Sequence, residues 1–353
     1  MEGLARWTTI MSQTADRRRD VVLDLPRTRQ LSVGMRAYAE VLAQRLPSVA
    51  PDLTFATLTR TSALDRHEQL DLVLRLRRLR PRLVHHLSVY APLATPRPYI
   101  VTIHDLIHLR FPAYFKRSVG PYYRTVVRFV VRRAARIITD DERTVGDLER
   151  FLGVRPRNIR IVPLGTDDAY HVENEPLPAQ TPYFIYAGNR REHKNLAALM
   201  RAWEELDPTL GVDLALTGND DGWLGGAQRP KRRRGELRFL GELSASELAR
   251  RYRGAVALVY PSLCEGFGLP MLEAASVGTP VIASSEAVPG VLRPYVQTFA
   301  PHDVGTLVRS MERALAHRID STEARRIARA LTWDRCAERT AEVYRELLAE
   351  ERR

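Results

Sequence analysis

Short apolar runs, many of them rich in Val, Ile and Leu, alternate with longer amphipathic stretches along almost the whole chain. A short apolar run predicts a buried strand, whereas an apolar repeat every three to four residues predicts a helix. Strands that alternate with helices form parallel sheets with helices on both faces, so we predict an α/β fold. The predicted strands lie at 21–25, 83–87, 99–104, 136–139, 159–163, 183–187, 213–217, 237–240, 255–260, 280–283 and 296–299. The clearest predicted helices lie at 35–46, 122–135, 195–205, 245–252, 306–316 and 333–350.

At 353 residues the chain is long enough for two domains that each bury a core. A polar, proline-bearing stretch at 171–182 divides the strands into two groups of similar size. We therefore predict an N-terminal domain over 21–175, a C-terminal domain over 180–332 and a disordered leader over 1–20. The helix at 333–350 follows the last strand, and the pattern alone allows it to pack on either domain. Ligands of parallel sheets bind beyond the carboxyl ends of the strands, where the functional residues are expected.

Several classes of protein are disfavoured by the composition. No stretch approaches the ~18 consecutive apolar residues of a transmembrane helix. The first residues lack the apolar core of a signal peptide. The two cysteines, Cys264 and Cys336, provide neither a disulfide framework nor a cysteine metal site. A cytoplasmic location is therefore expected.

The basic charge is concentrated in the N-terminal half. Of the formal net charge of +12, a net +10 falls in residues 1–175, which hold 29 Lys and Arg against 19 Asp and Glu. One explanation is an anionic partner such as a membrane surface, a lipid phosphate or nucleic acid. The other is a general preference for Arg over Lys. No recognition motif accompanies the charge, so nucleic acid is not a predicted partner.

The segment 261–285 carries the strongest functional signal. Glu265 and Glu273 lie eight positions apart, in a glycine-rich loop and in the helix that follows it, with Pro270 near the start of that helix. The free N–H groups of a helix start bind anions, whereas a carboxylate accepts hydrogen bonds from hydroxyl groups. The hydroxyls of a ribose and of a hexose suit the two carboxylates. The segment therefore predicts a site for a sugar nucleotide.

Three other loops at predicted strand ends hold candidate residues. Gly34 would allow a close backbone approach to a diphosphate, although a lone glycine is also typical of a plain turn. His104 could bind a sugar hydroxyl or transfer a proton, although a single histidine is more often structural. Lys194 lies at a helix start, where a cation is unfavourable unless an anion compensates it. Arg190 or Arg191 could reach the same anion, and the alternative is a solvated basic loop.

In this order, these segments resemble the retaining GT-B glycosyltransferases of family 4, the group 1 transferases. The similarity covers nearly all of the chain after residue 20, and the Glu-x7-Glu pattern with its following Gly-Thr-Pro-Val is the most specific part. The resemblance implies two Rossmann-like domains that face a cleft, with a helix at 333–350 that crosses back to the first domain. It also implies transfer of a hexose from a nucleoside-diphosphate sugar to a glycan, lipid-linked or polysaccharide acceptor. The anomeric configuration of the transferred sugar would be retained, and the reaction would require neither a metal nor another cofactor.

The resemblance also implies roles for single residues. Glu273 would bind the ribose hydroxyls and Glu265 the hydroxyls of the transferred sugar. Lys194 would neutralise the diphosphate, and His104 would contact the sugar at the reaction centre. The further residues implied in donor binding are Gly34, Gly188, Asn189, Arg190, Gly266, Phe267, Gly268 and Leu269.

Two departures from the family pattern bear on the function. Asn189 stands where many members have Arg, and Asp140-Asp141-Glu142 stands where Ser-Glu is usual. A catalytically silent, sugar-nucleotide-binding subunit therefore stays open as an alternative, as does an epimerase or hydrolase of the same fold. The family's acceptors bind to the basic N-terminal half. Within it, 116–136 mixes Arg with aromatic residues and Val, as an interfacial helix on an anionic membrane does. An ordinary helix with a buried apolar side is the other reading.

Overall fold

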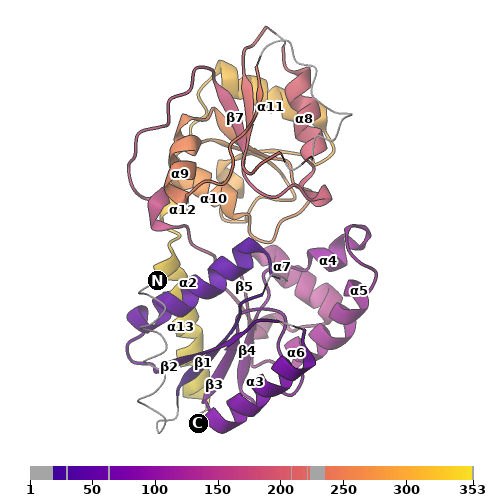
Figure 1. Cartoon of the computed structure of the whole chain (residues 1–353), viewed down its shortest axis with the longest axis vertical. Coiled ribbons are helices and arrows are strands. Elements are labelled where there is room, and N and C mark those ends of the chain that lie inside the picture. Colours follow the sequence, from indigo (N-terminus) through magenta and orange to yellow (C-terminus); the bar gives the residue numbers. More distant parts are fainter. Residues whose placement is uncertain are drawn as a thin grey trace.

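The computed structural model describes residues 19–28, 31–62, 64–207, 209–220, 222 and 235–351. The predicted leader at 1–20 therefore lies almost entirely outside the described residues. Two parallel six-stranded sheets, each flanked by helices, lie one above the other along the long axis of the molecule (Figure 1). The predicted α/β fold with two parallel sheets is confirmed.

The N-terminal sheet has the strand order β2-β1-β3-β4-β5-β6. Its inner strands are buried along their whole length apart from the half-buried Arg136 at the start of β5, in keeping with their content of Val, Ile and Leu. The edge strand β2 escapes the sequence analysis because Thr and Arg interrupt its apolar residues and it is mostly half-buried. The strands are β1 (Val21–Pro26), β2 (Phe55–Arg60), β3 (Leu83–His86), β4 (Tyr99–Thr102), β5 (Arg136–Thr139) and β6 (Ile159–Ile161).

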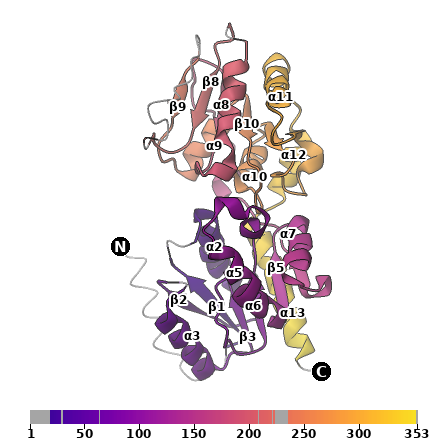
Figure 2. The same ribbon diagram turned by 90° about the vertical axis from the view of Figure 1, so that its right-hand side faces the viewer.

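Helices cover both faces of this sheet (Figure 2). The arginine-rich α3 was not predicted. Asp65 caps its start by accepting from the N–H groups of His67 and Glu68, each at 2.9 Å. A π-helical turn, Tyr123–Val127, joins α5 to α6, so the predicted helix 122–135 is one continuous but irregular element. The helices are α2 (Val33–Val49), α3 (Arg66–Leu79), α4 (Ile107–Arg110), α5 (Val119–Tyr122), α6 (Arg128–Arg133) and α7 (Glu142–Asp147).

The C-terminal sheet has the order β12-β11-β10-β7-β8-β9. The chain winds in one direction from β7 and in the other from β10, so the two adjacent strands form the topological switch point of this sheet. The strands are β7 (Tyr183–Tyr186), β8 (Asp213–Leu216), β9 (Leu237–Phe239), β10 (Ala257–Tyr260), β11 (Val281–Ser284) and β12 (Gln297–Phe299). The helices are α8 (Leu196–Glu205), α9 (Ala245–Gly254), α10 (Leu269–Ser276), α11 (Val304–Ala316) and α12 (Thr322–Arg329).

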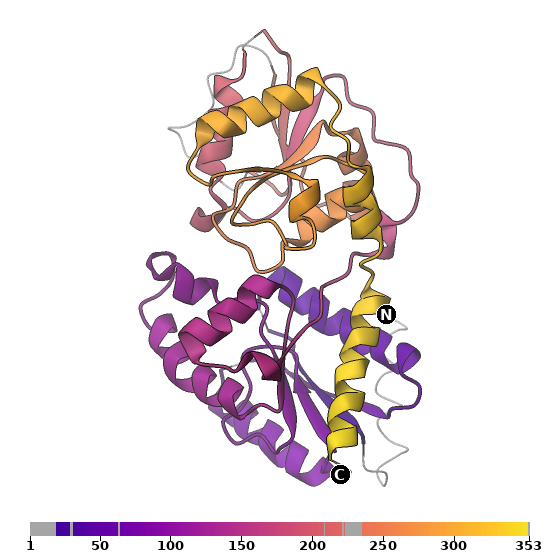
Figure 3. The same ribbon diagram turned by 180° about the vertical axis from the view of Figure 1, so that it is seen from behind.

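The last helix, α13 (Trp333–Glu350), follows the C-terminal sheet in sequence but runs down the back of the N-terminal sheet (Figure 3). It packs on α2. Its buried Tyr344 hydroxyl lies 2.6 Å from His85 Nδ1 on β3. Glu346 forms ion pairs with Arg136 and Arg160, and the pKa of its carboxyl falls to about 2 mainly through the hydrogen bond from Arg160. Residues from the C-terminal end of the chain therefore form part of the packing around the N-terminal sheet.

Candidate functional site

A buried ion pair lies at the switch point of the C-terminal sheet. Lys194 ends a 3-10 turn, Glu192–Lys194, after β7, and Glu265 lies in the loop after the adjacent β10. Lys194 Nζ donates to both carboxylate oxygens of Glu265, at 2.6 and 2.8 Å, and the two side chains are only 9% and 10% exposed. The ammonium also lies 3.4 Å from the Tyr260 hydroxyl. The anion that compensates Lys194 within the chain is thus the Glu265 carboxylate.

Asn195 joins the two loops that carry this pair. It has a left-handed backbone, with φ of 53°, a conformation that Asn tolerates better than most residues. Its side-chain amide donates to the carbonyl oxygens of Pro261 at 3.2 Å and Pro301 at 2.9 Å. Asn195 therefore fixes the position of Lys194 relative to the Glu265 loop. The sequence analysis missed it, since nothing local marks an amide that bonds to residues 66 and 106 positions away.

The Glu265 loop has two glycines at positions where a side chain would be crowded. Gly268 has φ of 82°, and a Cβ built there would lie 2.2 Å from Met271 Cε. A Cβ on Gly266 would lie 3.0 Å from Asp105 Oδ2 and 3.3 Å from the His104 carbonyl oxygen. α10 begins directly afterwards at Leu269, near the position predicted from Pro270. The loop thus opens a helix and closely approaches the N-terminal domain.

Gly34 and His104 bring the N-terminal domain to the same place. A Cβ on Gly34, in the first turn of α2, would lie 3.9 Å from Leu269 Cδ1. His104 follows β4, and its ring is edge-on to Tyr38 with centroids 4.6 Å apart. The structure therefore brings Gly34 and His104 close to the 265–269 loop, across the boundary between the two sheets.

Glu273 lies in α10, half-buried and separate from the Lys194 pair in its contacts. The Tyr252 hydroxyl donates to its Oε2 at 3.4 Å, and Tyr170 also bonds to this carboxylate. Burial raises the pKa of Glu273 to about 7, against the lowering effect of both tyrosines. Neither tyrosine was predicted, because each is an ordinary apolar-face residue in its own sequence segment.

The loop that begins at Gly188 has its polar groups turned to β8. The Gly188 N–H donates to Thr217 Oγ1 at 3.2 Å, and the Asn189 carbonyl accepts from Tyr186 at 2.6 Å. The Arg190 guanidinium donates to the carbonyls of Thr217 and Asn219 and lies over the Phe239 ring, 4.9 Å from its centroid. In this conformation Arg190 contacts residues of β9 and of the segment that follows β8. It does not take part in the Lys194–Glu265 pair.

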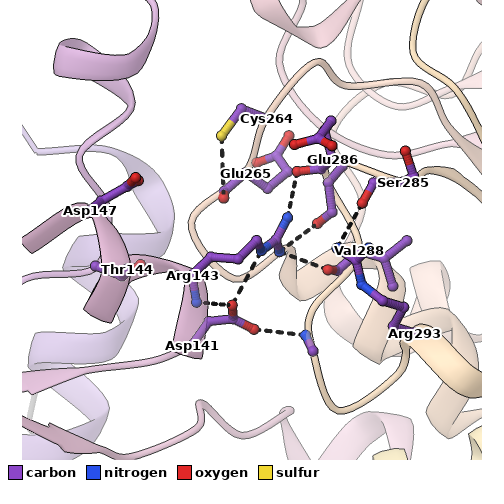
Figure 4. A network of polar contacts seen from close by, with 12 residues as sticks. Asp141, Arg143, Thr144, Asp147, Cys264, Glu265, Ser285, Glu286, Val288 and Arg293 are labelled. Carbon is purple, nitrogen blue, oxygen red and sulfur yellow. Dashed lines mark hydrogen bonds and ion pairs between the residues drawn. The ribbon is translucent and has the colours of Figure 1, made fainter. Parts of the chain in front are cut away.

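A polar network joins the start of α7 to the loop after β11 (Figure 4). Asp141 caps α7 through the Arg143 N–H at 2.9 Å, and its second oxygen accepts from the Gly290 N–H at 2.7 Å. The Arg143 guanidinium donates to the carbonyls of Glu286 and Val288, the latter at 2.7 Å. Two residues of the segment that departs from the family pattern thus form specific contacts. Asp141 bonds to the C-terminal domain through Gly290, and Asp140 Oδ2 lies 2.6 Å from His104 Nδ1 within the N-terminal domain.

The described part of the chain was compared with the requirements of a membrane span and of a metal site through its helices and its His, Cys, Asp and Glu side chains. No helix there is long and apolar enough to cross a bilayer. Within the same residues, no group of three or more His, Cys, Asp and Glu side chains is arranged to hold a metal ion.

The family model for glycosyl transferases group 1 matches residues 169–331, and the model for glycosyltransferase family 4 matches residues 33–170. O-antigen chain mannosyltransferase B of Escherichia coli is 26% identical over 289 residues, which cover 76% of each chain. Matches to two further curated relatives span 52% and 63% of those proteins' lengths.

Solved structures share the whole architecture. Sucrose-phosphate synthase from Thermosynechococcus elongatus superposes with a TM-score of 0.73 at 19% identity, covering 94% of this chain and 100% of that one. Anabaena HepE in complex with UDP-glucose superposes with a TM-score of 0.68 at 15% identity, covering 92% and 99%.

Two parallel α/β domains that meet at the carboxyl ends of their strands define the GT-B class of enzyme fold. Together, the two family models match residues 33–331 without a break, and they cover every strand except β1 as well as the loops around Lys194, Glu265 and His104. The chain belongs to the group 1 glycosyltransferases.

Proposed function

We propose that this chain transfers a hexose from a nucleoside-diphosphate sugar to a glycan, lipid-linked or polysaccharide acceptor, with retention of anomeric configuration and without a metal ion. The observation that carries the proposal is the buried Lys194–Glu265 pair at the switch point, with Gly266 packed against His104 and Asp105. A cation, a hydroxyl-binding carboxylate and two domain edges thus meet in one place.

The pair gives each residue a separate task. The Lys194 ammonium and the N–H groups at the start of α10 would stabilise charge that develops on the leaving diphosphate. Glu265 would accept hydrogen bonds from the sugar hydroxyls. Because Lys194 holds both oxygens of Glu265, diphosphate binding at the ammonium would also orient the carboxylate toward the sugar.

Glu273 would bind the ribose hydroxyls, and His104 would contact the sugar at the reaction centre. The Glu273 carboxylate already accepts hydrogen bonds from the Tyr170 and Tyr252 hydroxyls. Ribose hydroxyls could bind to the same oxygens in a similar way. The solved HepE complex of the same fold contains UDP-glucose, which supports the donor class.

A screen of UDP-, GDP- and ADP-linked sugars by thermal shift tests the proposal. A donor at ~100 times its Kd stabilises the folded state by about 2.7 kcal/mol, so the melting temperature should rise by several degrees for one nucleotide class. The free hexose serves as the control. The selected donor is then incubated with glycan acceptors, and transfer is followed by mass spectrometry. Donor binding without any turnover would indicate the silent subunit, and turnover to an epimer or to free sugar would indicate the rival enzymes.

We further propose peripheral association with an anionic inner membrane face through residues 116–136. The apolar side of this segment packs into the protein, since Tyr123, Val127, Val130 and Val131 are buried. Its exposed side carries basic residues and Phe129, which is 47% exposed. The attraction would therefore be mainly electrostatic, at about 1 kcal/mol for each basic residue near the surface.

Vesicle flotation tests this association. The protein should float with phosphatidylcholine vesicles that contain phosphatidylglycerol and not with pure phosphatidylcholine. Arg128→Glu/Arg132→Glu should reduce the bound fraction at least ~10-fold, because it reverses two exposed charges of the segment. The matched control is Arg313→Glu/Arg318→Glu, which reverses two exposed charges of the C-terminal domain. Equal binding to both vesicle types would refute the proposal.

A further inference from the structure

A second buried pair of titratable side chains lies on the N-terminal side of the site. His104 and Asp140 follow the adjacent parallel strands β4 and β5, so the carboxyl ends of these strands bring them together. His104 Nδ1 lies 2.6 Å from Asp140 Oδ2, and the side chains are 8% and 1% exposed. The Thr144 hydroxyl also donates to the His104 carbonyl, at 3.1 Å. Ring and backbone of His104 are both held in place.

The two ring nitrogens of His104 differ in their hydrogen bonding. Among the described residues, His104 Nε2 is buried and has no hydrogen-bond partner. A buried polar atom without a partner costs about 1–3 kcal/mol, so the fold retains this arrangement at the expense of its own stability. The Gly266 loop lies directly against the His104 backbone. Because this ring nitrogen is unpaired and lies next to the Glu265 loop, it could form a hydrogen bond with a bound substrate.

The surroundings of the ring favour its charged form. Burial alone would lower the pKa of His104, but the Asp140 carboxylate outweighs burial and raises it, with a smaller contribution from Asp105. Burial raises the pKa of Asp140 itself, against the lowering effect of His104, and Asp105 and Asp141 are the other carboxylates near it. Burial keeps the remaining titratable neighbours neutral: it raises the pKa of Tyr38 on α2 and of Cys336 on α13, and lowers that of His85 on β3 to about 3.

We propose that Asp140 is a positioning residue that holds His104 as an imidazolium, so that Nε2–H donates a hydrogen bond to an oxygen of the bound substrate. A carboxylate at Nδ1 accepts that N–H and fixes the ring orientation. His104 then serves as a hydrogen-bond donor and does not take the proton of the acceptor hydroxyl. The substrate contact rests on the proposed function, whereas the state of the ring can be measured in the free protein.

NMR titration of histidine-labelled protein tests the pair without any substrate. The His104 signal is identified by its loss in His104→Gln. The wild-type ring should titrate above the ordinary pKa of ~6.5, and Asp140→Asn should lower that pKa by about one unit or more. Asp147→Asn, which removes a half-buried carboxylate near Arg110, is the matched control and should leave the His104 titration unchanged. An unchanged titration in Asp140→Asn would overturn the proposal.

The pH dependence of donor turnover then tests the role of the ring. Turnover is measured as nucleoside diphosphate released from the donor selected by thermal shift. The basic limb of the wild-type profile should move to lower pH in Asp140→Asn by about the shift found by NMR, with donor KM changed less than ~3-fold. A uniform loss of turnover at every pH in Asp140→Asn, or a shift of the acidic limb, would contradict the proposed role of the His104 ring. If the wild type releases no diphosphate, the proposed function fails while the NMR result stands.

Discussion

Replacing Lys194 by alanine is expected to lower kcat for sugar transfer by about 10²–10³-fold. Lys194 is the cation proposed to stabilise the leaving diphosphate, and removal of one preorganised electrostatic group typically costs that much. The substitution also leaves Glu265 buried without its partner, which is expected to destabilise the fold by about 3–5 kcal/mol. Initial rates at saturating donor and thermal melts measure the two effects.

A double variant separates catalysis from folding. Lys194→Ala/Glu265→Gln removes the uncompensated charge and should recover much of the lost stability, while turnover stays low. Lys116→Ala, at an exposed lysine of the N-terminal domain, is the matched control and should behave as wild type with a soluble acceptor. Turnover of Lys194→Ala within ~3-fold of wild type would show that Lys194 has no role in the chemistry.

Replacing Glu273 by glutamine is expected to stabilise the folded chain at pH 8 and to weaken donor binding. The folded-state pKa of Glu273 is about 7, above the ordinary value of 4.5. The folded chain therefore binds this proton more tightly than the unfolded chain, and stability falls as the pH rises from about 4.5 to 7. The loss is at most about 3 kcal/mol. Glutamine removes it, so the melting temperature should rise at pH 8 and stay unchanged at pH 4.5.

Donor affinity should follow the same ionisation in the opposite direction. In the proposed role an ionised Glu273 would accept hydrogen bonds from two ribose hydroxyls, so wild-type affinity should fall as the pH drops below 7. The Glu273→Gln variant should bind about 10–100-fold more weakly at pH 8, since hydrogen bonds to a charged acceptor contribute about 1.5–3 kcal/mol. Calorimetry at pH 6 and 8 measures the donor affinity of the wild type and of the variant. The exposed Glu312→Gln is the control. Wild-type affinity that does not change with pH would argue against Glu273 as a donor ligand.

The regular elements were predictable where the local pattern is strong. The inner strands are continuous apolar runs, and their burial matches that pattern. The edge strand β2 and the helix α3 were missed for a common reason. Phe55–Arg60 is half polar because it is covered only in part, and Arg66–Leu79 is rich in arginine because most of its surface faces water.

The sequence singled out the loops that carry the candidate residues, but it did not predict the contacts among those residues. Glu265 and Lys194 were assigned to different parts of the donor, yet in the structure they bind to each other. The roles of the predicted site residues stay predictions for the experiments above. Asp140 was noted only as a departure from the family pattern, and its pairing with His104, 36 positions away, has no local signal.

The α/β fold, the family and the positions of the candidate loops follow from the sequence alone, because hydrophobic period, turn residues and motif spacing act over a few neighbouring positions. The tertiary structure decided which charges meet. Strand order places the loops after β7 and β10 side by side, and the loops after β4 and β5 likewise, although each pair is far apart in the chain. Contact between domains added Gly266 on Asp105 and Arg143 on the carbonyls of Glu286 and Val288. Ion pairing depends on distance in space and on burial, and both are set only when the sheets are assembled.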